Sequence, residues 1–294
     1  MRMGVGKVSA RLSADMPLIS AQVQAWMTEL AGGAEPVAYF LHPAAFPTML
    51  LPWWLEHQLT GTFDPGFQTD LIFSNAILYY YTRMVDNVMD GHATVEPKLL
   101  PAAGYFVSQG YNAYRPWFGP DHPFWDFFAA TWSEYCDVTA ADGQLEDTDE
   151  QSFTSIVSRK VCAAKISVAA VCFHYEQPDA LPRWSEWIDV FGRWHLFQED
   201  LFDWQQDLNL GVVTYILCEA RRRKRPGELE VSWFAREGLD WGFEKLVSWM
   251  RQLRQMTFAP EEVLAYLDLR ERDLYTHREK IAGALAMIRQ LSQT

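Results

Sequence analysis

The chain has 294 residues, of which 49% are hydrophobic and 15% aromatic, and its 38 acidic against 25 basic residues give a formal net charge of −13. This composition allows a large buried core, while the acidic surface argues against binding to the phosphate backbone of a nucleic acid. No uncharged apolar run reaches the ~18 residues of a membrane span, and no signal-peptide pattern opens the chain, so we expect no transmembrane segment. The four cysteines form no close pair, which argues against a zinc site or a disulfide framework. A cytoplasmic protein is therefore expected.

Apolar residues recur at helical spacing along most of the chain, and prolines and glycines separate one stretch from the next. Residues 1–14 show no such period and are expected to fray, whereas the acidic stretch 142–150 is typical of a solvated loop. Helices are predicted over 17–30, from Asp64-Pro65 to Asp90, after Pro97, after Pro123, and over 152–176, 182–209, 212–224, 241–256 and 260–291, with only short helices among the prolines of 36–52. No stretch shows sustained strand alternation, so the pattern predicts an all-α protein in which residues 1–294 form a single domain.

The acidic stretch 197–207 lies inside one of these apolar helices. Glu199, Asp203 and Asp207 are spaced i, i+4, i+8, which places three carboxylates on one helix face at steps of about 6 Å. Like charges at this spacing destabilise an isolated helix, so a compensating cation is expected.

A second pair of carboxylates, Asp86 and Asp90, closes the predicted helix that begins at Asp64-Pro65. Two helices that each carry aromatic residues and a carboxylate pair could face each other across a pocket, with divalent metal at its mouth. Oxygen-only ligands suit a hard cation such as Mg²⁺, which usually shares its coordination shell with substrate phosphate. A diphosphate is therefore the natural ligand.

Two alternatives compete with this metal site. A carboxylate pair at i, i+4 is often only a solvated helix face, although the apolar surroundings of both pairs weaken that interpretation. A di-iron or di-manganese carboxylate bundle needs Glu-x-x-His on two helices. None of the seven histidines has a glutamate three residues before it, which argues against such a bundle.

Basic residues should accompany a diphosphate, because they hydrogen-bond its outer oxygens. The candidates are Arg159, Lys160 and Lys165 in the predicted helix 152–176, followed by the weaker Arg193, Arg272 and Arg278. A surface ion pair is the competing interpretation of Arg159 and Lys160. The basic run 221–225 is more typical of an exposed helix end than of a phosphate site.

The two acidic motifs resemble those of the class I isoprenoid synthase superfamily, nearest its trans-polyprenyl synthetase branch. The stretch Val85 to Asp90 matches the Asp-Asp-x-x-Asp motif of that family with Asn87 in the second place, and Phe197 to Asp203 matches its second motif, which follows a Phe-Gln pair. Glu199, Asp203 and Asp207 also fit the metal triad of class I terpene synthases. Lys160-Val161 occupies the place of a Lys-Thr pair, and the match covers residues 67–210.

The resemblance implies an all-α, single-domain helical bundle of the isoprenoid synthase type with a central apolar cavity, Mg²⁺ as cofactor (three ions with bound diphosphate) and a prenyl diphosphate as substrate. The metal ligands that it implies are Asp86, Asp90, Glu199, Asp200, Asp203 and Asp207. Catalytic assistance is expected from Arg159, Lys160, Tyr79 and Tyr81, and substrate binding from Asn75, Arg83, Lys165 and Gln198. Homodimers are common in similar families, so a homodimer is a further expectation.

Helical spacing relates several of these residues to the first acidic motif. Tyr79 and Arg83 share the face of Asp86, and Asn75 lies one turn further from the motif. Tyr81 stands five places before Asp86, where related synthases set the depth of the pocket, so its bulky ring predicts a shorter substrate. Plain core packing is the competing interpretation of both tyrosines, and an ion pair to Asp86 is the competing interpretation of Arg83.

The departures from the family pattern bear on the reaction. Chain-elongating synthases have a basic motif near the N-terminus and an arginine pair soon after the first aspartate motif, to bind a second diphosphate. Here residues 36–66 contain no lysine or arginine, and residues 91–96 contain no arginine. We therefore expect a terpene synthase (class IB type) that ionises one farnesyl or geranylgeranyl diphosphate. The alternatives are a polyprenyl diphosphate synthase, a catalytically silent partner subunit of one, and transfer of the prenyl group to another acceptor.

Overall fold

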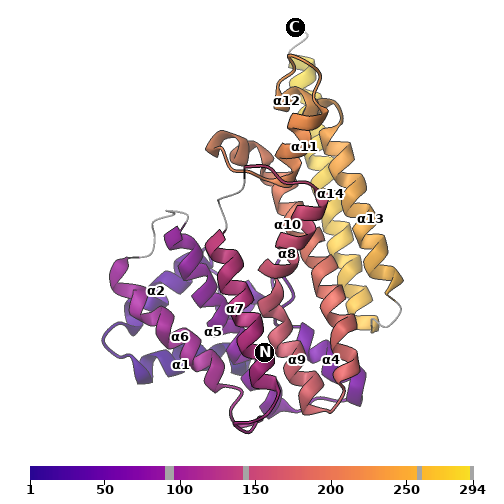
Figure 1. The fold of residues 1–294 in the computed structure, drawn as a ribbon. Coiled ribbons are helices and arrows are strands. Elements are labelled where there is room, and N and C mark those ends of the chain that lie inside the picture. The colour runs from indigo at the N-terminus through magenta and orange to yellow at the C-terminus, as the bar shows by residue number, and fades with distance from the viewer. Residues whose placement is uncertain (90–95, 142–145, 257–259, 292–294) are drawn as a thin grey trace. The chain divides into compact units, whose positions relative to one another are not determined.

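Helices account for all regular secondary structure in residues 1–89, 96–141, 146–256 and 260–291, which are the residues that the computed structural model describes (Figure 1). The all-α prediction is confirmed. Within these ranges no helix is both long enough and apolar enough to cross a bilayer.

The chain divides into two compact units, each built from two separate stretches. Unit 1 consists of residues Met1–Ser133 and Ala163–Pro182, and unit 2 consists of Glu134–Cys162 and Arg183–Thr294. The first acidic motif belongs to unit 1 and the second to unit 2. That residues 1–294 act as a single domain stays a prediction.

Unit 1 is organised around the helix α5 (Pro65–Met89), against which α1 and α6 pack (Figure 1). The other helical elements that contribute to this unit are α1 (Arg2–Asp15), α2 (Ser20–Leu30), α3 (Pro36–Phe40), α4 (Leu51–Thr60), η1 (Pro97–Leu99), α6 (Leu100–Asn112), the first part of α7 (Phe124–Ala141), α9 (Lys165–His174) and η3 (Pro178–Ala180). The predicted start of α5 is confirmed, because the Asp64 carboxylate accepts hydrogen bonds from the backbone N–H groups of Gly66 and Phe67 at 2.7 and 3.0 Å. This helix continues as far as Met89, and its predicted end at Asp90 lies outside the described residues.

The expectation that residues 1–14 fray is wrong, because these residues form α1. Val5, Val8 and Leu12 lie on one face of α1 and are buried. Gly4 lets α1 approach α5 closely, since a Cβ atom at this position would stand 2.6 Å from the side chain of Ile72. Only these three large apolar side chains of α1 are buried, so the local pattern is weak, and the packing against α5 supplies the stability that the local sequence lacks.

Unit 2 contains the longer helices α10 (Leu181–Leu210), α13 (Leu239–Gln255) and α14 (Glu261–Leu291). Figure 1 shows α13 and α14 running side by side, and the two helices are in contact. The shorter elements are α8 (Glu150–Lys160), α11 (Tyr215–Arg223), α12 (Glu230–Trp233) and the π-helical turn η4 (Phe234–Gly238). The core of unit 2 is aromatic, with the side chains of Trp187, Phe191, Trp194 and Phe197 of α10 fully buried.

The predicted helix over 152–176 is two helices, so this expectation is corrected. The first, α8, ends at Lys160, a short 3-10 turn follows over Cys162–Ala164, and α9 begins at Lys165. The chain passes from unit 2 to unit 1 at this break. On the unit 2 side, Val161 packs so closely on Gly192 of α10 that a Cβ atom there would stand 2.9 Å from the valine. No proline or glycine marks the break, which is why the sequence pattern runs through it.

All four cysteines are free thiols. Cys162, Cys172 and Cys218 are buried, whereas Cys136 of α7 is exposed.

Candidate functional site

The first acidic motif closes α5 in unit 1. The Asp86 carboxylate is partly exposed, and its Oδ2 atom lies 3.5 Å from Nη1 of Arg83. This ion pair is one of the two roles that the sequence left open for Arg83. The distance is at the long end for a hydrogen bond, so the pair holds the carboxylate only loosely. Asn87, in the second place of the motif, is buried, and Asp90 lies outside the described residues.

The two tyrosines before this motif have different surroundings. The Tyr79 hydroxyl shares a short hydrogen bond with that of Tyr39, and the Tyr79 ring meets Phe40 edge-on with 5.2 Å between ring centroids. Burial, followed by the hydrogen bond to Tyr39, holds the pKa of Tyr79 far above its usual value. Tyr81 instead packs against the ring of Trp132, with centroids 5.4 Å apart. Tyr79 is therefore a neutral phenol, and both rings pack on aromatic neighbours.

Asn75 has a structural role within unit 1. Its amide nitrogen donates to the carbonyl oxygen of Thr48 at 2.8 Å and to Oγ of Ser167 at 3.1 Å. These bonds fasten α5 to the segment before α4 and to α9. Both amide hydrogens of Asn75 are thus used by the fold, which leaves its predicted part in substrate binding without support from these contacts.

The second acidic motif lies on α10, so its predicted place within one helix is confirmed. Burial and then the charge of Asp207 raise the pKa of Asp200 to about 8, with Lys160 acting in the opposite direction. Burial and then Asp203 likewise raise the pKa of Asp207. Among the described residues, neither Asp203 nor Asp207 has a cationic side chain at ion-pair distance. The carboxylates crowd one another, as the i, i+4 spacing predicts.

Glu199 begins this row of carboxylates, and its neighbours connect it to a buried cation. Nε2 of His195 lies 3.5 Å from the Glu199 carboxylate, one turn away on α10. The other ring nitrogen of His195 lies 3.3 Å from Nη2 of Arg270, which also donates to Oε1 of Gln198 at 3.2 Å. Burial and the Arg270 charge lower the pKa of His195 to about 3, so this imidazole is neutral.

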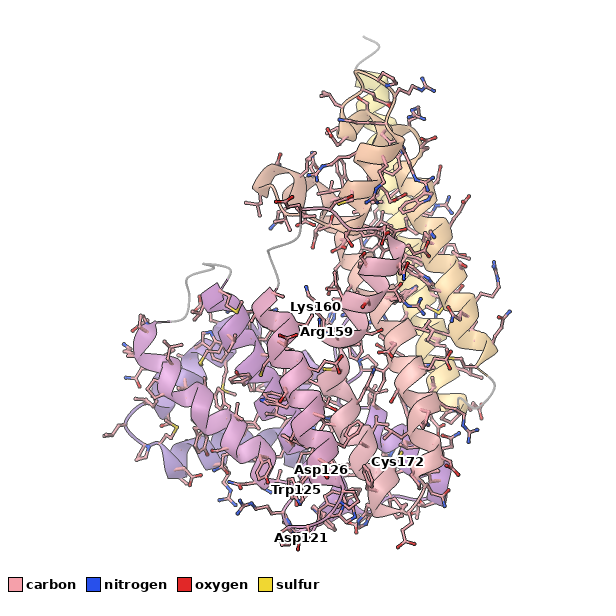
Figure 2. The ribbon with its side chains drawn as sticks, viewed as in Figure 1. Asp121, Trp125, Asp126, Arg159, Lys160 and Cys172 are labelled. Carbon is pink, nitrogen blue, oxygen red and sulfur yellow. The ribbon has the colours of Figure 1, made fainter. Side chains whose placement is uncertain are left out.

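The predicted basic residues are held in different ways. Figure 2 shows Arg159 and Lys160 at the end of α8. Arg159 forms a short ion pair with Asp137 and lies 3.6 Å from Glu134, and both acidic residues are on α7. A surface ion pair was the alternative to a phosphate-binding role for Arg159. The charge of Lys160 lowers the pKa of Asp200 and so opposes the effect of burial. Lys165 is half-buried at the start of α9 in unit 1.

The three weaker basic candidates have contacts within unit 2. Arg193 stacks over the Trp249 ring at 6.0 Å, Arg278 pairs with Asp240 at 2.9 Å, and exposed Arg272 donates to the carbonyl oxygen of Asp268 at 3.3 Å. The run 221–225 ends α11, as predicted. Carboxylates pair with its members Arg222, Arg223 and Lys224.

Sequence reasoning missed Arg270, which is 1% exposed. A signal was present, because Arg270 is in helical register with the buried residues Val263, Leu267 and Leu274 of α14. A charged residue on the apolar stripe of a helix needs partners inside the protein.

The donor set of the second motif suits a hard cation. All candidate ligands are carboxylate oxygens, which Mg²⁺ prefers, and their mutual repulsion would be relieved by positive charge. In the part of the chain that the structure describes, no three histidine, cysteine or acidic side chains converge closely enough to enclose a metal by themselves.

Comparisons with known proteins show the fold. No family model matches the chain, and no curated protein matches it. Among the solved structures that match is a geranylgeranyl pyrophosphate synthetase from the archaeon Geoglobus acetivorans, with a TM-score of 0.64, 15% sequence identity, and coverage of 94% of this chain and 99% of that one. The predicted isoprenoid-synthase-type fold is thereby confirmed.

Proposed function

We propose that the protein is a Mg²⁺-dependent terpene synthase that ionises one allylic prenyl diphosphate, of the farnesyl or geranylgeranyl class, and releases pyrophosphate. The observation that carries this proposal is the row of crowded carboxylates on α10, which includes Asp203 and Asp207 without a cationic partner among the described residues. The same fold in a geranylgeranyl pyrophosphate synthetase supports it.

The carboxylates of both motifs would hold the metal. In unit 1 these are Asp86 and Asp90, and in unit 2 they are Glu199, Asp203 and Asp207, with Asp200 as an additional ligand. Bound Mg²⁺ would neutralise the charge that develops on the diphosphate as the allylic C–O bond breaks. The carboxylates of α10 are suited to this role, because burial and the like charges beside them raise the pKa values of Asp200 and Asp207, and a bound cation would offset that repulsion.

Protein N–H groups would complete the binding of the departing diphosphate. Lys160, Lys165 and Arg159 are the candidates, and Arg159 would have to exchange its contacts with Asp137 and Glu134 for phosphate oxygens. Arg83 could make the same exchange from Asp86. Gln198 would contribute its side-chain N–H₂ group, since its oxygen already accepts from Arg270.

Aromatic rings would stabilise the allylic cation in a dry apolar cavity, which stays a prediction. Tyr79 and Tyr81 are the proposed rings near the first motif. The raised pKa of Tyr79 keeps its phenol protonated, so it would offer a π face and a hydroxyl dipole and would not act as a base.

A single substrate is proposed because a second diphosphate would lack a cationic receptor. Residues 36–66, which include α3 and α4, contain no lysine or arginine. The competing function is chain elongation as a polyprenyl diphosphate synthase. The likeness to a solved geranylgeranyl pyrophosphate synthetase favours this second candidate, whereas the missing basic residues argue against it.

The test is incubation of purified protein with Mg²⁺ and farnesyl or geranylgeranyl diphosphate, with and without isopentenyl diphosphate. Release of pyrophosphate together with a cyclic hydrocarbon or alcohol, detected by gas chromatography, is expected without the second substrate. A longer prenyl diphosphate that forms only when isopentenyl diphosphate is added would establish the elongase instead. A chain that turns over neither substrate, and whose melting temperature does not respond to Mg²⁺ with pyrophosphate, would contradict both functions.

A further inference from the structure

Arg270 of α14 is a cation inside an aromatic part of unit 2. Its guanidinium lies 4.8 Å from the ring centroid of Trp194 and 5.6 Å from that of Phe191, and the residue is almost fully buried. Removing a guanidinium from water is costly, and aromatic faces recover only part of that cost. Such a residue is retained where its hydrogen bonds serve a purpose that an apolar side chain cannot serve.

The hydrogen bonds of Arg270 lead to the second acidic motif. Nη2 donates to Oε1 of Gln198 at 3.2 Å and lies 3.3 Å from Nδ1 of His195, while Nη1 donates to the Tyr266 hydroxyl at 3.1 Å. Gln198 immediately precedes Glu199, and His195 lies one turn before it. The guanidinium therefore contacts the residue immediately before the first carboxylate of the row and the residue one helical turn before it.

The chemistry of this contact fixes the state of His195. A guanidinium has only hydrogen-bond donors, so Nδ1 of the imidazole must be the acceptor. The proton of the neutral ring is then on Nε2, the atom that faces the Glu199 carboxylate at 3.5 Å. Arg270 thus turns a donor of His195 toward Glu199, in the way that partners behind a metal-ligand side chain commonly orient it.

We propose that Arg270 is a positioning residue, which fixes the Gln198 side chain directly and the Glu199 carboxylate through His195. The inference rests on the proposed function, in which Glu199 helps to hold Mg²⁺ and diphosphate. His195, Glu199, Asp203 and Asp207 follow one another at i, i+4, so Arg270 anchors the row at one end.

The experiment compares Arg270→Met with Arg270→Lys and with a control on the same helix. Methionine fills much of the volume without a charge, and replacing a buried charge by an apolar residue often leaves stability unchanged. Lysine keeps the charge and the donor to His195. Arg272→Met is the matched control, because Arg272 is exposed on α14 and contacts only a backbone carbonyl of its own helix among the interactions that the structure gives.

Two measurements decide the proposal. The first is the tautomer of His195 by ¹⁵N NMR of histidine-labelled protein, assigned by the resonances that His195→Gln removes. The second is the Mg²⁺ concentration that gives half of the thermal stabilisation at saturating inorganic pyrophosphate. We expect the Nε2–H tautomer in the wild type, in Arg272→Met and in Arg270→Lys. Arg270→Met should show a tautomer mixture and need at least tenfold more Mg²⁺.

An unchanged tautomer and an unchanged Mg²⁺ midpoint in folded Arg270→Met would overturn the proposal. If this variant does not fold, Arg270→Lys and His195→Gln are measured in its place. A wild-type Mg²⁺ midpoint in His195→Gln would overturn the proposal that Arg270 positions Glu199 through His195. A wild type that does not respond to Mg²⁺ with pyrophosphate would instead remove the proposed function. The tautomer measurement needs no ligand, so it still tests the Arg270–His195 contact in that case.

Discussion

The buried Glu56 of unit 1 and the acidic residues of α10 in unit 2 have very different surroundings. In unit 1, the fully buried Glu56 of α4 accepts hydrogen bonds from Nε2 of Gln68 at 2.6 Å, from the backbone N–H of Asp64 at 2.8 Å and from the Tyr175 hydroxyl. In unit 2, burial and then the like charge of Asp207 raise the pKa of Asp200 to about 8, whereas Glu199 and Asp203 of the same helix are exposed. Glu56 therefore has hydrogen-bond donors within the fold. The acidic residues of α10 repel one another, and a bound cation would reduce that repulsion.

Removing one charge from the row on α10 should have the largest effect on function. If Asp203 binds Mg²⁺ as proposed, Asp203→Asn should lower turnover of the proposed prenyl diphosphate substrate by on the order of 10³-fold, because a charged ligand would be lost. Stability should stay the same or rise slightly, since a repulsion is removed. Pyrophosphate release and urea unfolding measure the two. Glu186→Gln, exposed on the same helix, is the control; equal activity of both variants would end the assignment of Asp203.

Changing Glu56 should produce the opposite result. In Glu56→Gln an N–H₂ group would face donors that now bond to a carboxylate, so we expect a loss of about 2–3 kcal/mol in the free energy of unfolding. Urea unfolding followed by circular dichroism measures this loss. The exposed Glu29→Gln should change stability by less than about 0.5 kcal/mol. The comparison between the units would fail if Glu56→Gln were as stable as the wild type.

The close contact between α5 and α6 predicts a smaller loss. A Cβ atom on Gly110 would stand 2.6 Å from the Leu78 side chain, so Gly110→Ala should cost about 1–3 kcal/mol through overpacking. Gly104→Ala on the same helix meets nothing within 4 Å and should stabilise the protein by up to about 1 kcal/mol. Thermal unfolding of the two variants compares them directly. Equal melting temperatures would show that α5 and α6 are less closely packed than described.

The smallest effect is expected at Arg159. Arg159→Gln breaks a partly exposed ion pair with Asp137 and Glu134, which should cost less than about 1 kcal/mol of stability. If Arg159 exchanges these partners for the departing diphosphate, kcat/KM should fall roughly tenfold. Steady-state kinetics and urea unfolding separate the two contributions. Unchanged kinetics would leave Arg159 with the ion pair as its role.

The sequence predicted the helical elements that have clear signals at their ends. The Asp64-Pro65 start of α5 and the apolar period of α10 are local features, and each places an acidic motif on its helix. The sequence pattern could not predict α1 or the break between α8 and α9, because both depend on tertiary packing. For α1 the contact is between Gly4 and Ile72, and for the break it is between Val161 and Gly192.

The candidate site was predictable in its acidic residues and much less so in its basic ones. Carboxylates at i, i+4 can be recognised without any knowledge of the fold. The partners of Arg159 are Glu134 and Asp137, residues of another helix that no spacing rule connects to it. Arg270 joins the motif only through hydrogen bonds that cross from α14 to α10. The resemblance to a known superfamily therefore indicated acidic residues on two helices, whose role as metal ligands stays a prediction, and it indicated none of the partners of these two arginines.

The exposure of a single thiol gives the natural chain a built-in labelling position. Cys136 of α7 lies at the surface, while the other three sulfhydryls are enclosed by the core. Partial burial raises the pKa of the Cys136 thiol, so a maleimide or spin label should attach faster under mildly alkaline conditions than at neutral pH. A fluorophore could thus be introduced on α7, just after the chain passes from unit 1 to unit 2 at Glu134, without mutating any other cysteine.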